Sequence, residues 1–455
     1  MKELRQEYID DVIALDGDVE GRRQALDLIE NSDVMVHGQP APFPYVPYLF
    51  SDGDLATVFA DMRTAHRILC KVIRRFLDDP SYRQIFHFPP EVERLILLPC
   101  GYDQLLPMGR FDVFLSEDDG SYKFCEFNTD GSGAMSRDLM IGRALMQGSA
   151  FKRFASKHDV EQFELFDSWA AAFMRIYESD PGHVTNPTVC ITDFRESGVF
   201  SDFDRFIEAF ERAGMSARFV DIRDFEFDGE HLVDPSDGTA IDAIYRRSVT
   251  SEILQHPGEC DAMIDAVAAG KVSLIGHFRT TVVHSKMVNV ALFDPRTAEF
   301  LTPEELAFVH AHVPRTYRMV SGESANAGEG NARAAFDIAE VKAHKDSWII
   351  KPEDDYGSHG VHPGVDCTQT EWEQLVDASI DCGCIVQEFC NPPLVDVVDT
   401  RIDESNPCAI TSWKSMPGIY MYDGEPVGFY CRLGSEGVIA IDHGGLCSCS
   451  FRVRS

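Results

Sequence analysis

Four polar side chains stand close together in a stretch of sequence that otherwise has the pattern of a β-hairpin. In GRFDVFLSEDDGSYKFCEFN, two strand-like runs flank a DDG turn, which is typical of a type I turn followed by a bulge. With Asp119 at the centre of the loop, Asp112 lies opposite Glu126 and Arg110 lies opposite Asn128. Because side chains alternate between the two faces of a strand, all four project from the same face.

This set of side chains suits a hard divalent cation. Mg²⁺ takes oxygen ligands and usually shares its coordination shell with phosphates, so Asp112, Glu126 and Asn128 are candidate metal ligands. Arg110 could then hold a phosphate that two carboxylates alone would repel. The alternative is a solvated hairpin face on which an arginine pairs with a carboxylate.

Two lysines in the second half of the chain are candidates for phosphate binding. Lys286 lies in VVHSKMVNVALF, and Lys351 ends the predicted strand SWIIKP, directly before the loop EDDYGSHG. A lysine at a strand end can hold phosphate oxygens together with backbone N–H groups, while an acid of the loop contacts the metal. An ordinary hairpin loop explains the same pattern equally well.

Two further segments complete the candidate site. In CIVQEFCNPP, an apolar strand runs into Gln387–Phe389, an edge that could hydrogen-bond a purine through its backbone, although a plain core strand is an alternative. The segment IYMYDGEPVGFYCRLG predicts a second hairpin with an Asp-Gly turn. Its second strand carries Arg432.

The bulk properties exclude several classes of protein. The net charge of -34 over 455 residues argues against binding to a nucleic-acid backbone, which requires clustered Lys and Arg. The N-terminal sequence lacks the basic start and apolar core of a signal peptide, and no apolar run is long enough to span a bilayer. We therefore expect a cytoplasmic protein of two or three domains, with neither nucleic-acid nor membrane partners.

The chain contains 13 cysteines, which are scattered and never form CxxC. The pairs Cys382/Cys384 and Cys447/Cys449 could mark a zinc or redox site, but their spacing is not that of the common sites. We interpret the cysteines as free thiols in a reducing compartment. A cysteine-based metalloprotein is the alternative.

Several elements should position these groups. Apolar residues at helical spacing predict a core-facing helix over 54–78, in which His66 is a packing residue. After Pro89-Pro90, residues 95–98 predict a short buried strand that leads to the hairpin. The hairpin is followed by the loop TDGSG, in which glycines let backbone approach a ligand, and by a helix from about Ser136.

From residue 188 the pattern changes to alternating strands and helices. VCITDF, ARFVDI and AIDAIYRR predict strands, with an amphipathic helix over 200–213, and together they indicate a small βαβ-type domain. Arg246 and Arg247 end the third strand, where open α/β sheets contact ligands. A surface pair is equally consistent with the sequence.

In combination, these motifs resemble the glutathionylspermidine synthase-like family of ATP-grasp ligases, over roughly residues 90–450. The family's Arg-x-Asp and Glu-x-Asn motifs precede its lysines, an order that is permuted relative to ordinary ATP-grasp enzymes, and this chain has the same order. The resemblance implies a mixed fold, α+β / α/β, namely a permuted ATP-grasp with an inserted small βαβ-type domain. The implied domains are residues 1–165, 166–275 and 276–455.

The resemblance also implies a role for each candidate residue. The implied catalytic residues are Arg110 and Arg432; the implied metal ligands are Asp112, Glu126, Asn128 and Asp355; and the implied ATP-binding residues are Lys286, Lys351, Gly357, Gly360, Gln387, Glu388 and Phe389. The loop EDDYGSHG departs from the family pattern, which is richer in glycine. No amidase-like region precedes the ligase-like part of this sequence, so spermidine is not favoured as the amine.

The implied function is ATP-dependent amide formation with Mg²⁺. The substrates would be a small peptide or glutathione-like carboxylate and an amine, joined through an acyl phosphate. Residues 321–334 and 354–360 are candidates for an element that closes over this intermediate. The alternative function is that of a non-catalytic nucleotide-binding protein with an ATP-grasp fold.

Overall fold

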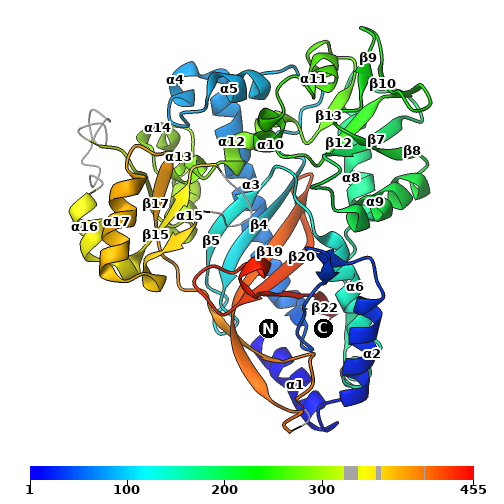
Figure 1. Cartoon of the computed structure of the whole chain (residues 1–455), viewed down its shortest axis with the longest axis vertical. Helices are drawn as coiled ribbons and strands as arrows, with labels where there is room; N and C mark the ends of the chain where they lie inside the picture. Colours follow the sequence, from blue (N-terminus) through cyan, green and yellow to red (C-terminus); the bar gives the residue numbers. More distant parts are fainter. Residues whose placement is uncertain (322–336, 355–359, 404, 455) are drawn as a thin grey trace.

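The computed structural model describes residues 1–321, 337–354, 360–403 and 405–454, and has a mixed α/β architecture (Figure 1). At its centre lies an antiparallel sheet in the order β21-β20-β19-β4-β5, with β18 paired to the other end of β19. The strands of this sheet are β4 (Met108–Leu115), β5 (Tyr122–Asn128), β18 (Leu394–Val398), β19 (Ile410–Tyr422), β20 (Glu425–Gly434) and β21 (Leu446–Ser448). Both predicted hairpins therefore lie in one sheet.

The turns of these hairpins follow from their residues. Asp423 and Gly424 connect β19 to β20 with φ angles of 51° and 84°, the left-handed conformation that a type I′ turn requires. In the β4–β5 hairpin, Arg110 pairs with Asn128 and Asp112 pairs with Glu126, as predicted. The register shifts directly after Asp112, which leaves Cys125 as a bulge in β5.

The long helix α3 (Asp52–Asp78) packs against β19 and β20 and confirms the predicted helix over 54–78. It starts at a capping box, in which the Ser51 hydroxyl accepts from the Asp54 N–H and the Asp54 carboxylate accepts from the Ser51 N–H. His66 is buried within it and bonds through Nε2 to the Leu106 carbonyl at 3.0 Å. This contact supports a packing role for His66.

The predicted strand over 95–98 is wrong. The structure has a helix there, α5 (Pro90–Ile96), which follows the short helix α4 (Pro80–Arg83). Pro90 occupies the first turn of α5, where its missing N–H costs no hydrogen bond, so the Pro-Pro pair starts a helix. The apolar run that suggested a strand is the buried side of this helix, with Val92, Leu95 and Ile96 inside.

A parallel sheet in the order β13-β12-β7-β8 forms a second part of the molecule. Its strands are β7 (Thr188–Asp193), β8 (Ser216–Asp221), β12 (Ala243–Arg246) and β13 (Ser273–Ile275), and its helices are α8 (Asp167–Glu178), α9 (Phe200–Arg212), α10 (Thr250–Gln255) and α11 (Asp261–Ala268). The strands predicted at VCITDF and ARFVDI and the helix over 200–213 are confirmed, whereas only residues 243–246 of the predicted strand AIDAIYRR belong to this sheet. A small antiparallel sheet that was not predicted, β9 (Glu226–Phe227), β10 (Leu232–Asp234) and β11 (Thr239–Ile241), lies between β8 and β12 in sequence.

A third sheet, antiparallel in the order β14-β17-β15-β16, carries Lys351. Its strands are β14 (Thr316–Arg318), β15 (Trp348–Pro352), β16 (His362–Pro363) and β17 (Cys384–Glu388), and the helices that accompany it are α16 (Ile338–Ala343) and α17 (Gln369–Ser379). This part has a core of its own, formed by Met319, Val341, Ile350, Trp372, Val376 and Val386.

The remaining elements pack around the central sheet or join the parts. They are α1 (Lys2–Ile13), α2 (Val19–Glu30), β1 (Met35–Val36), β2 (Gln39–Pro40), β3 (Tyr48–Ser51), α6 (Met135–Leu145), α7 (Ser149–Ala155), β6 (Asp159–Gln162), α12 (Thr281–His284), α13 (Met287–Leu292), α14 (Pro295–Ala298), α15 (Pro303–His312) and β22 (Ser450–Arg454). Helix α6 is the predicted helix near Ser136. Within the described ranges, no helix has both the length and the apolar character of a membrane span.

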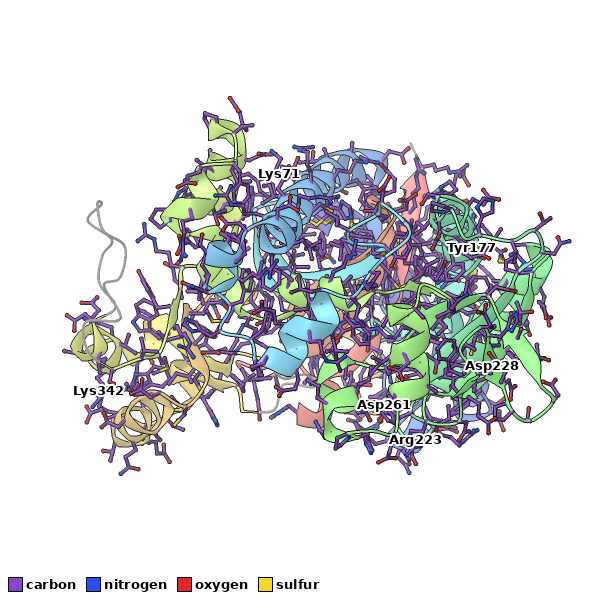
Figure 2. The ribbon with its side chains drawn as sticks, turned by 90° about the horizontal axis from the view of Figure 1, so that it is seen from above. Lys71, Tyr177, Arg223, Asp228, Asp261 and Lys342 are labelled. Carbon is purple, nitrogen blue, oxygen red and sulfur yellow. The ribbon has the colours of Figure 1, made fainter. Side chains whose placement is uncertain are left out.

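Seen from above, the parts lie beside one another (Figure 2). Lys342 of α16 marks one side, Arg223, Asp228 and Asp261 of the parallel-sheet part mark the other, and Lys71 of α3 lies between them. Residues from both outer parts can therefore reach the central sheet, which carries the Arg110–Asn128 hairpin.

One buried carboxyl group ties the C-terminal strand to α6. The Oδ1 atom of Asp138 accepts hydrogen bonds from the N–H and the hydroxyl of Ser450, at 2.9 and 2.8 Å. Asp138 is 1% exposed, and burial raises its pKa to about 7. The folded protein therefore holds this carboxyl protonated at pH values where the unfolded chain ionises it.

We predict that Asp138→Asn changes the pH dependence of stability. Between about pH 4 and 7 the unfolded chain of the wild type loses this proton while the folded chain keeps it, so the free energy of unfolding falls as pH rises. The free energy of unfolding of the variant should not fall in this way. The difference in the free energy of unfolding between variant and wild type should therefore grow over that interval, to roughly a few kcal/mol at most. Denaturant unfolding at several pH values measures the difference, with the exposed Asp159→Asn as control. Parallel curves for wild type and Asp138→Asn would contradict the prediction.

Candidate active site

The site is built on a buried carboxylate that two arginines share. Asp112 is 0% exposed, and it accepts hydrogen bonds from Arg110 Nε at 2.8 Å and from Arg110 Nη2 at 3.1 Å. The Nη2 atom of Arg432 donates to the Asp112 Oδ2 atom as well, and Asn128 Nδ2 donates to it at 2.8 Å. The four polar groups therefore converge on one face of the central sheet.

A glycine on β19 makes room for this convergence. Gly418 pairs with Asp112 on β4 and with Tyr430 on β20, so β19 separates the strands that carry Asp112 and Arg432. A Cβ atom at Gly418 would lie 2.2 Å from Asp112 Oδ1. Because the glycine leaves its backbone bare, Arg432 can reach across β19 to Asp112.

Tyr430 supports the arginines from the same face. The guanidinium carbons of Arg110 and Arg432 lie 5.2 and 5.7 Å from the centre of the Tyr430 ring, within the range of a cation–π contact. The Tyr430 hydroxyl accepts a hydrogen bond from Arg137 Nη1 at 3.2 Å. Tyr430 was not among the predicted site residues, although its position two residues before Arg432 on a strand places it on the same face.

One cavity brings together the predicted groups from distant parts of the chain. It encloses about 790 Å³ of free space, its mouth included. Its polar lining includes Glu126, Asn128, Lys286, Lys351, Gln387 and Arg432. Its apolar walls include Ile349, Met416, Val438 and Ile439. None of these four was predicted from the sequence.

Lys351 is held at this cavity by its neighbours. It is 6% exposed, and its ammonium donates to Gln387 Oε1 at 2.8 Å across the β15–β17 pair. The backbone carbonyl of Cys125, the bulge residue of β5, lies 3.5 Å from the same ammonium. The bulge therefore helps to join the third sheet to the hairpin.

Lys286 reaches the cavity from the connection between α12 and α13. Its backbone N–H donates to the carbonyl of Glu353 at 2.9 Å, directly after β15. Both lysines are thus tied to the same strand, although 64 intervening residues separate them in sequence. This tie places two ammonium-bearing side chains at one cavity.

Glu126 stands among the cations of the cavity. Burial alone would raise the pKa of Glu126, but Lys286, Arg432 and Lys351 outweigh burial and lower that pKa to about 2. The side chain keeps 31% of its surface exposed. Glu126 therefore presents a full negative charge to the cavity at any physiological pH.

The segment Gln387–Phe389 borders the cavity, but two of its donors are already used. The Glu388 N–H donates to the Arg315 carbonyl and the Phe389 N–H donates to the Ser347 carbonyl, each at 2.8 Å. A purine at this edge would have to use the carbonyl groups of the segment or the backbone of Cys390, which also lines the cavity. Backbone contacts of this kind depend on the tertiary structure and have no sequence signal.

Part of the predicted site lies outside the described residues. Asp355 and Gly357 belong to this group, as do residues 322–334 and 355–359 of the two segments proposed to close over the site. Gly360 is described and has a φ angle of +65°, which favours glycine. A Cβ atom there would lie 3.0 Å from the Pro352 ring.

A second cavity meets the first at the shared arginine–carboxylate cluster. Arg110, Glu126, Asn128 and Arg432 border it, and the first cavity shares the last three. Its other walls come from the TDGSG loop, from Arg137 on α6, and from the loop after β7. The glycines of the TDGSG loop pack against protein: a Cβ atom at Gly131, where φ is +69°, would lie 2.3 Å from the Arg247 carbonyl.

The sequence left open whether Arg246 and Arg247 form a surface pair, and in the structure both are buried. They are 3% and 4% exposed. Arg246 forms an ion pair with Asp130 of the TDGSG loop, and Arg247 Nη2 lies 3.3 Å from Asp202 Oδ2. Of the two, Arg247 lines the second cavity.

Mg²⁺ fits the junction of the cavities through two residues. Asn128 donates its amide N–H groups to Asp112 and to Glu126 Oε1, the latter at 3.2 Å, which leaves the amide oxygen for a cation. Among the described residues, no group of three or more His, Cys, Asp and Glu side chains converges to hold a metal. A site of one carboxylate and one amide oxygen is sufficient for Mg²⁺ when phosphates complete the shell. Asp112 borders neither cavity and already accepts from both arginines.

Among the described residues, the cysteines form no metal-binding group. All 13 are free thiols, and five of them are buried. Cys125 and Cys390 line the first cavity, and burial raises the pKa of Cys390 to about 11. At neutral pH this thiol is protonated and a poor nucleophile.

Comparison with known proteins identifies the fold. No protein-family model matches the sequence, and no curated protein matches it. Among solved structures, a glutathione synthetase-like effector from Globodera pallida, in its apo form, matches with a TM-score of 0.59 and 13% identity over 96% of each chain. The chain has a mixed α/β fold that resembles glutathione synthetase-like ATP-grasp structures.

Two other structures match less well. A putative γ-glutamylcysteine synthetase from Methylobacillus flagellatus has a TM-score of 0.40 and 13% identity, over 81% of this chain and 82% of that one. The D-cycloserine synthetase DcsG has a TM-score of 0.30 and 11% identity, over 58% of this chain and 75% of that one. Both TM-scores are too low to indicate a shared fold.

We predict that Gly418→Ala destabilises the site. The new methyl group would displace the Asp112 carboxylate, which is buried and holds four hydrogen bonds, so the free energy of unfolding should fall by roughly 2 kcal/mol. Chemical denaturation measures this loss. In the control Gly53→Ala, near the start of α3, the nearest atom lies 3.7 Å away and the effect should be small. Equal stability of Gly418→Ala and the wild type would show that the close approach is unimportant.

Proposed function

We propose that this chain is an ATP-dependent carboxylate–amine ligase, similar to the glutathionylspermidine synthases, that joins a small peptide or glutathione-like carboxylate to an amine. The observation that carries the proposal is the meeting of two cavities at Arg432, Glu126 and Asn128. A ligase of this kind needs a nucleotide site and a carboxylate site that open onto one reacting centre. The fold similarity to a glutathione synthetase-like protein supports the same class.

The first cavity is proposed to bind ATP. The ammonium groups of Lys286 and Lys351 would hold phosphate oxygens, and the apolar side chains of Met416 and Ile439 would pack against the purine. Gln387, Glu388 and Phe389 would border the purine edge. Lys351 is already oriented by its hydrogen bond to Gln387, so little conformational freedom would be lost on binding.

Glu126 and the amide oxygen of Asn128 would hold Mg²⁺, with Asp112 and Asp355 as further predicted ligands. When bound, the ion would neutralise charge on the phosphates of ATP. The hairpin that carries these ligands precedes both lysines in the sequence, as in the permuted arrangement that the resemblance implies.

The proposed chemistry takes place where the cavities meet. A carboxylate oxygen from the second cavity attacks the γ-phosphorus, the bond to the β–γ bridging oxygen breaks, and ADP leaves. The amine nitrogen then attacks the carbonyl carbon of the acyl phosphate, which releases phosphate and one proton and forms the amide. Arg110 and Arg432, both anchored to Asp112, would stabilise the charge on the transferring phosphoryl group.

We predict that Glu126→Gln abolishes amine-dependent ADP release while the protein remains folded. Loss of this charge would weaken Mg²⁺ binding and remove the negative charge that Lys286, Arg432 and Lys351 surround, so the rate should fall by about 100-fold or more. A coupled assay of ADP release, with Mg²⁺ and panels of small peptides and amines, measures the rate. Thermal unfolding checks the fold.

The matched control is Glu425→Gln, whose side chain is 60% exposed and pairs with Arg63 at the surface. This variant should keep the wild-type rate. If Glu126→Gln released ADP as fast as the wild type, the proposed metal role would be wrong. If the wild type bound ATP but released no ADP with any pair of substrates, the chain would be a non-catalytic nucleotide-binding protein.

A further inference from the structure

The second cavity holds more cationic groups than phosphoryl transfer requires. Arg110 and Arg432 lie at the junction, where both pair with Asp112. Arg137 and Arg247 line the same cavity and make no contact with Asp112 among the interactions of the described residues. These two arginines need an explanation of their own.

Arg247 is a buried charge that is only partly compensated. Its side chain is 2% exposed and lies between the rings of Phe203 and Tyr245, whose centres are 5.3 and 5.6 Å from the guanidinium carbon. Its Nη2 atom lies 3.3 Å from Asp202, but that carboxylate also accepts from the Ala134 and Ser136 N–H groups at 2.8 Å each. Among the described residues, Nε and Nη1 of Arg247 have no hydrogen-bond partner.

Arg137 also lacks a hydrogen-bond acceptor for one of its N–H groups in the described part of the chain. Its Nη1 atom donates to the Tyr430 hydroxyl, which is uncharged, and its Nε atom has no partner within the described ranges. Unpaired buried N–H groups on a cation are costly, and an acceptor on a bound ligand would relieve that cost. Two such arginines on one cavity indicate an anionic group of the ligand.

The acids of the cavity do not provide this compensation. Asp193 Oδ1 accepts the Phe194 N–H at 2.9 Å, and burial raises the pKa of Asp193 to about 7 despite the nearby Arg247. Glu252 also lines the cavity, and its carboxylate accepts the Ser197 hydroxyl. Glu126 is the carboxylate at the junction.

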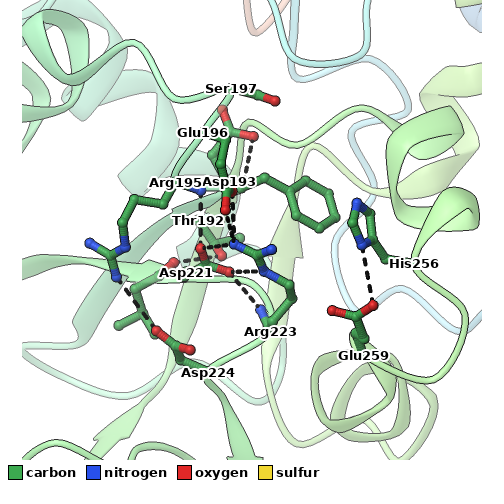
Figure 3. Close-up of polar contacts among 12 residues, drawn as sticks. Thr192, Asp193, Arg195, Glu196, Ser197, Asp221, Arg223, Asp224, His256 and Glu259 are labelled. Carbon is green, nitrogen blue, oxygen red and sulfur yellow. Dashed lines mark hydrogen bonds and ion pairs between the residues drawn. The ribbon is translucent and has the colours of Figure 1, made fainter.

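Ion pairs and hydrogen bonds hold the loop after β7 in place beside the second cavity. Arg223 bridges Asp221 and Glu196, with Nη2–oxygen distances of 2.7 and 2.8 Å, and the Arg195 N–H donates to Asp221 at 3.0 Å (Figure 3). Burial raises the pKa of Asp221, but its hydrogen bonds to Arg223 outweigh burial and lower that pKa to about 2. These contacts hold the segment that carries Asp193 and Ser197 against the cavity.

We propose that the carboxylate substrate carries a second carboxylate, which Arg247 and Arg137 bind while the first carboxylate reacts at Arg110 and Arg432. This inference rests on the proposed function, and it narrows the substrate from a small peptide or glutathione-like carboxylate to a peptide-like molecule whose second acidic group is recognised by Arg247 and Arg137. Substrates with one carboxylate leave the free N–H groups of Arg247 and Arg137 without an acceptor, so the enzyme discriminates against them.

The test compares dipeptides that carry two carboxylates, such as Glu-Gly, with matched peptides in which one carboxylate is an amide, Gln-Gly and Glu-Gly amide. Calorimetric titration of the full chain with Mg²⁺ and ADP present measures binding, and the ADP-release assay measures turnover. The wild type should bind the diacid about tenfold or more tightly than either monoamide. Arg137→Gln should bring these affinities within about threefold of one another, and Arg247→Lys should restore more of the preference than Arg247→Gln does.

The control is Arg205→Gln on α9, whose side chain pairs with Asp33 outside this cavity and should leave the preference unchanged. Because Arg247→Gln removes a buried charge and could unfold the protein, the half-buried Arg137 provides the decisive variant. Equal binding of diacid and monoamides by the wild type would overturn the inference, and ADP release with monocarboxylates would then leave the ligase function standing. A preference for the diacid without ADP release would support the role of Arg247 and Arg137 in binding the second carboxylate, and it would contradict the proposed ligase function.

Discussion

The structure of the site depends on one buried carboxylate. Asp112 accepts from Arg110 on its own strand, from Arg432 two strands away and from Asn128 across the hairpin. A buried ion pair of this kind contributes little net stability, but removal of one partner leaves a charge in a dry environment and costs roughly 3–5 kcal/mol. The shared carboxylate therefore holds the two guanidinium groups in place relative to each other.

The rest of the site is arranged around that fixed cluster. Gly418 keeps the strand between Asp112 and Arg432 free of side-chain atoms, and Tyr430 lies beneath both guanidinium groups. The third sheet brings Lys351 and the segment Gln387–Phe389 to one side, and the parallel-sheet part brings Arg247 to the other. Two cavities of different chemistry result, one with apolar walls and two lysines, the other with four arginines.

Local patterns in the sequence predicted much of this arrangement. The alternation of side chains placed Arg110, Asp112, Glu126 and Asn128 on one face, and the structure has the predicted pairs even though the turn itself is displaced. Near the turn, Leu115 pairs with Tyr122, which is one residue out of the predicted register. The bulge at Cys125 compensates for this shift, so Asp112 pairs with Glu126 as predicted. The strand end at Lys351 and the Asp-Gly turn before Arg432 were also predictable, since both depend on short-range signals.

The remaining features depend on contacts between distant segments, which leave no local signal. Residues 95–98 were apolar enough for a strand, but Pro90 started a helix there instead. The burial of Arg247 could not be inferred, because Asp202 and Phe203 of α9 meet it only in the fold. The role of Gly418 was equally hidden, since the side chains that need its space belong to other strands.

The central claim is that a substrate carboxylate from the second cavity attacks ATP at the Arg110–Asp112–Arg432 cluster. The most direct measurement uses a carboxylate substrate labelled with oxygen-18 in its reacting carboxyl group, followed by mass spectrometry of the phosphate released during turnover. Passage through an acyl phosphate predicts the transfer of one labelled oxygen to each phosphate. Unlabelled phosphate, released together with the amide product, would contradict the account.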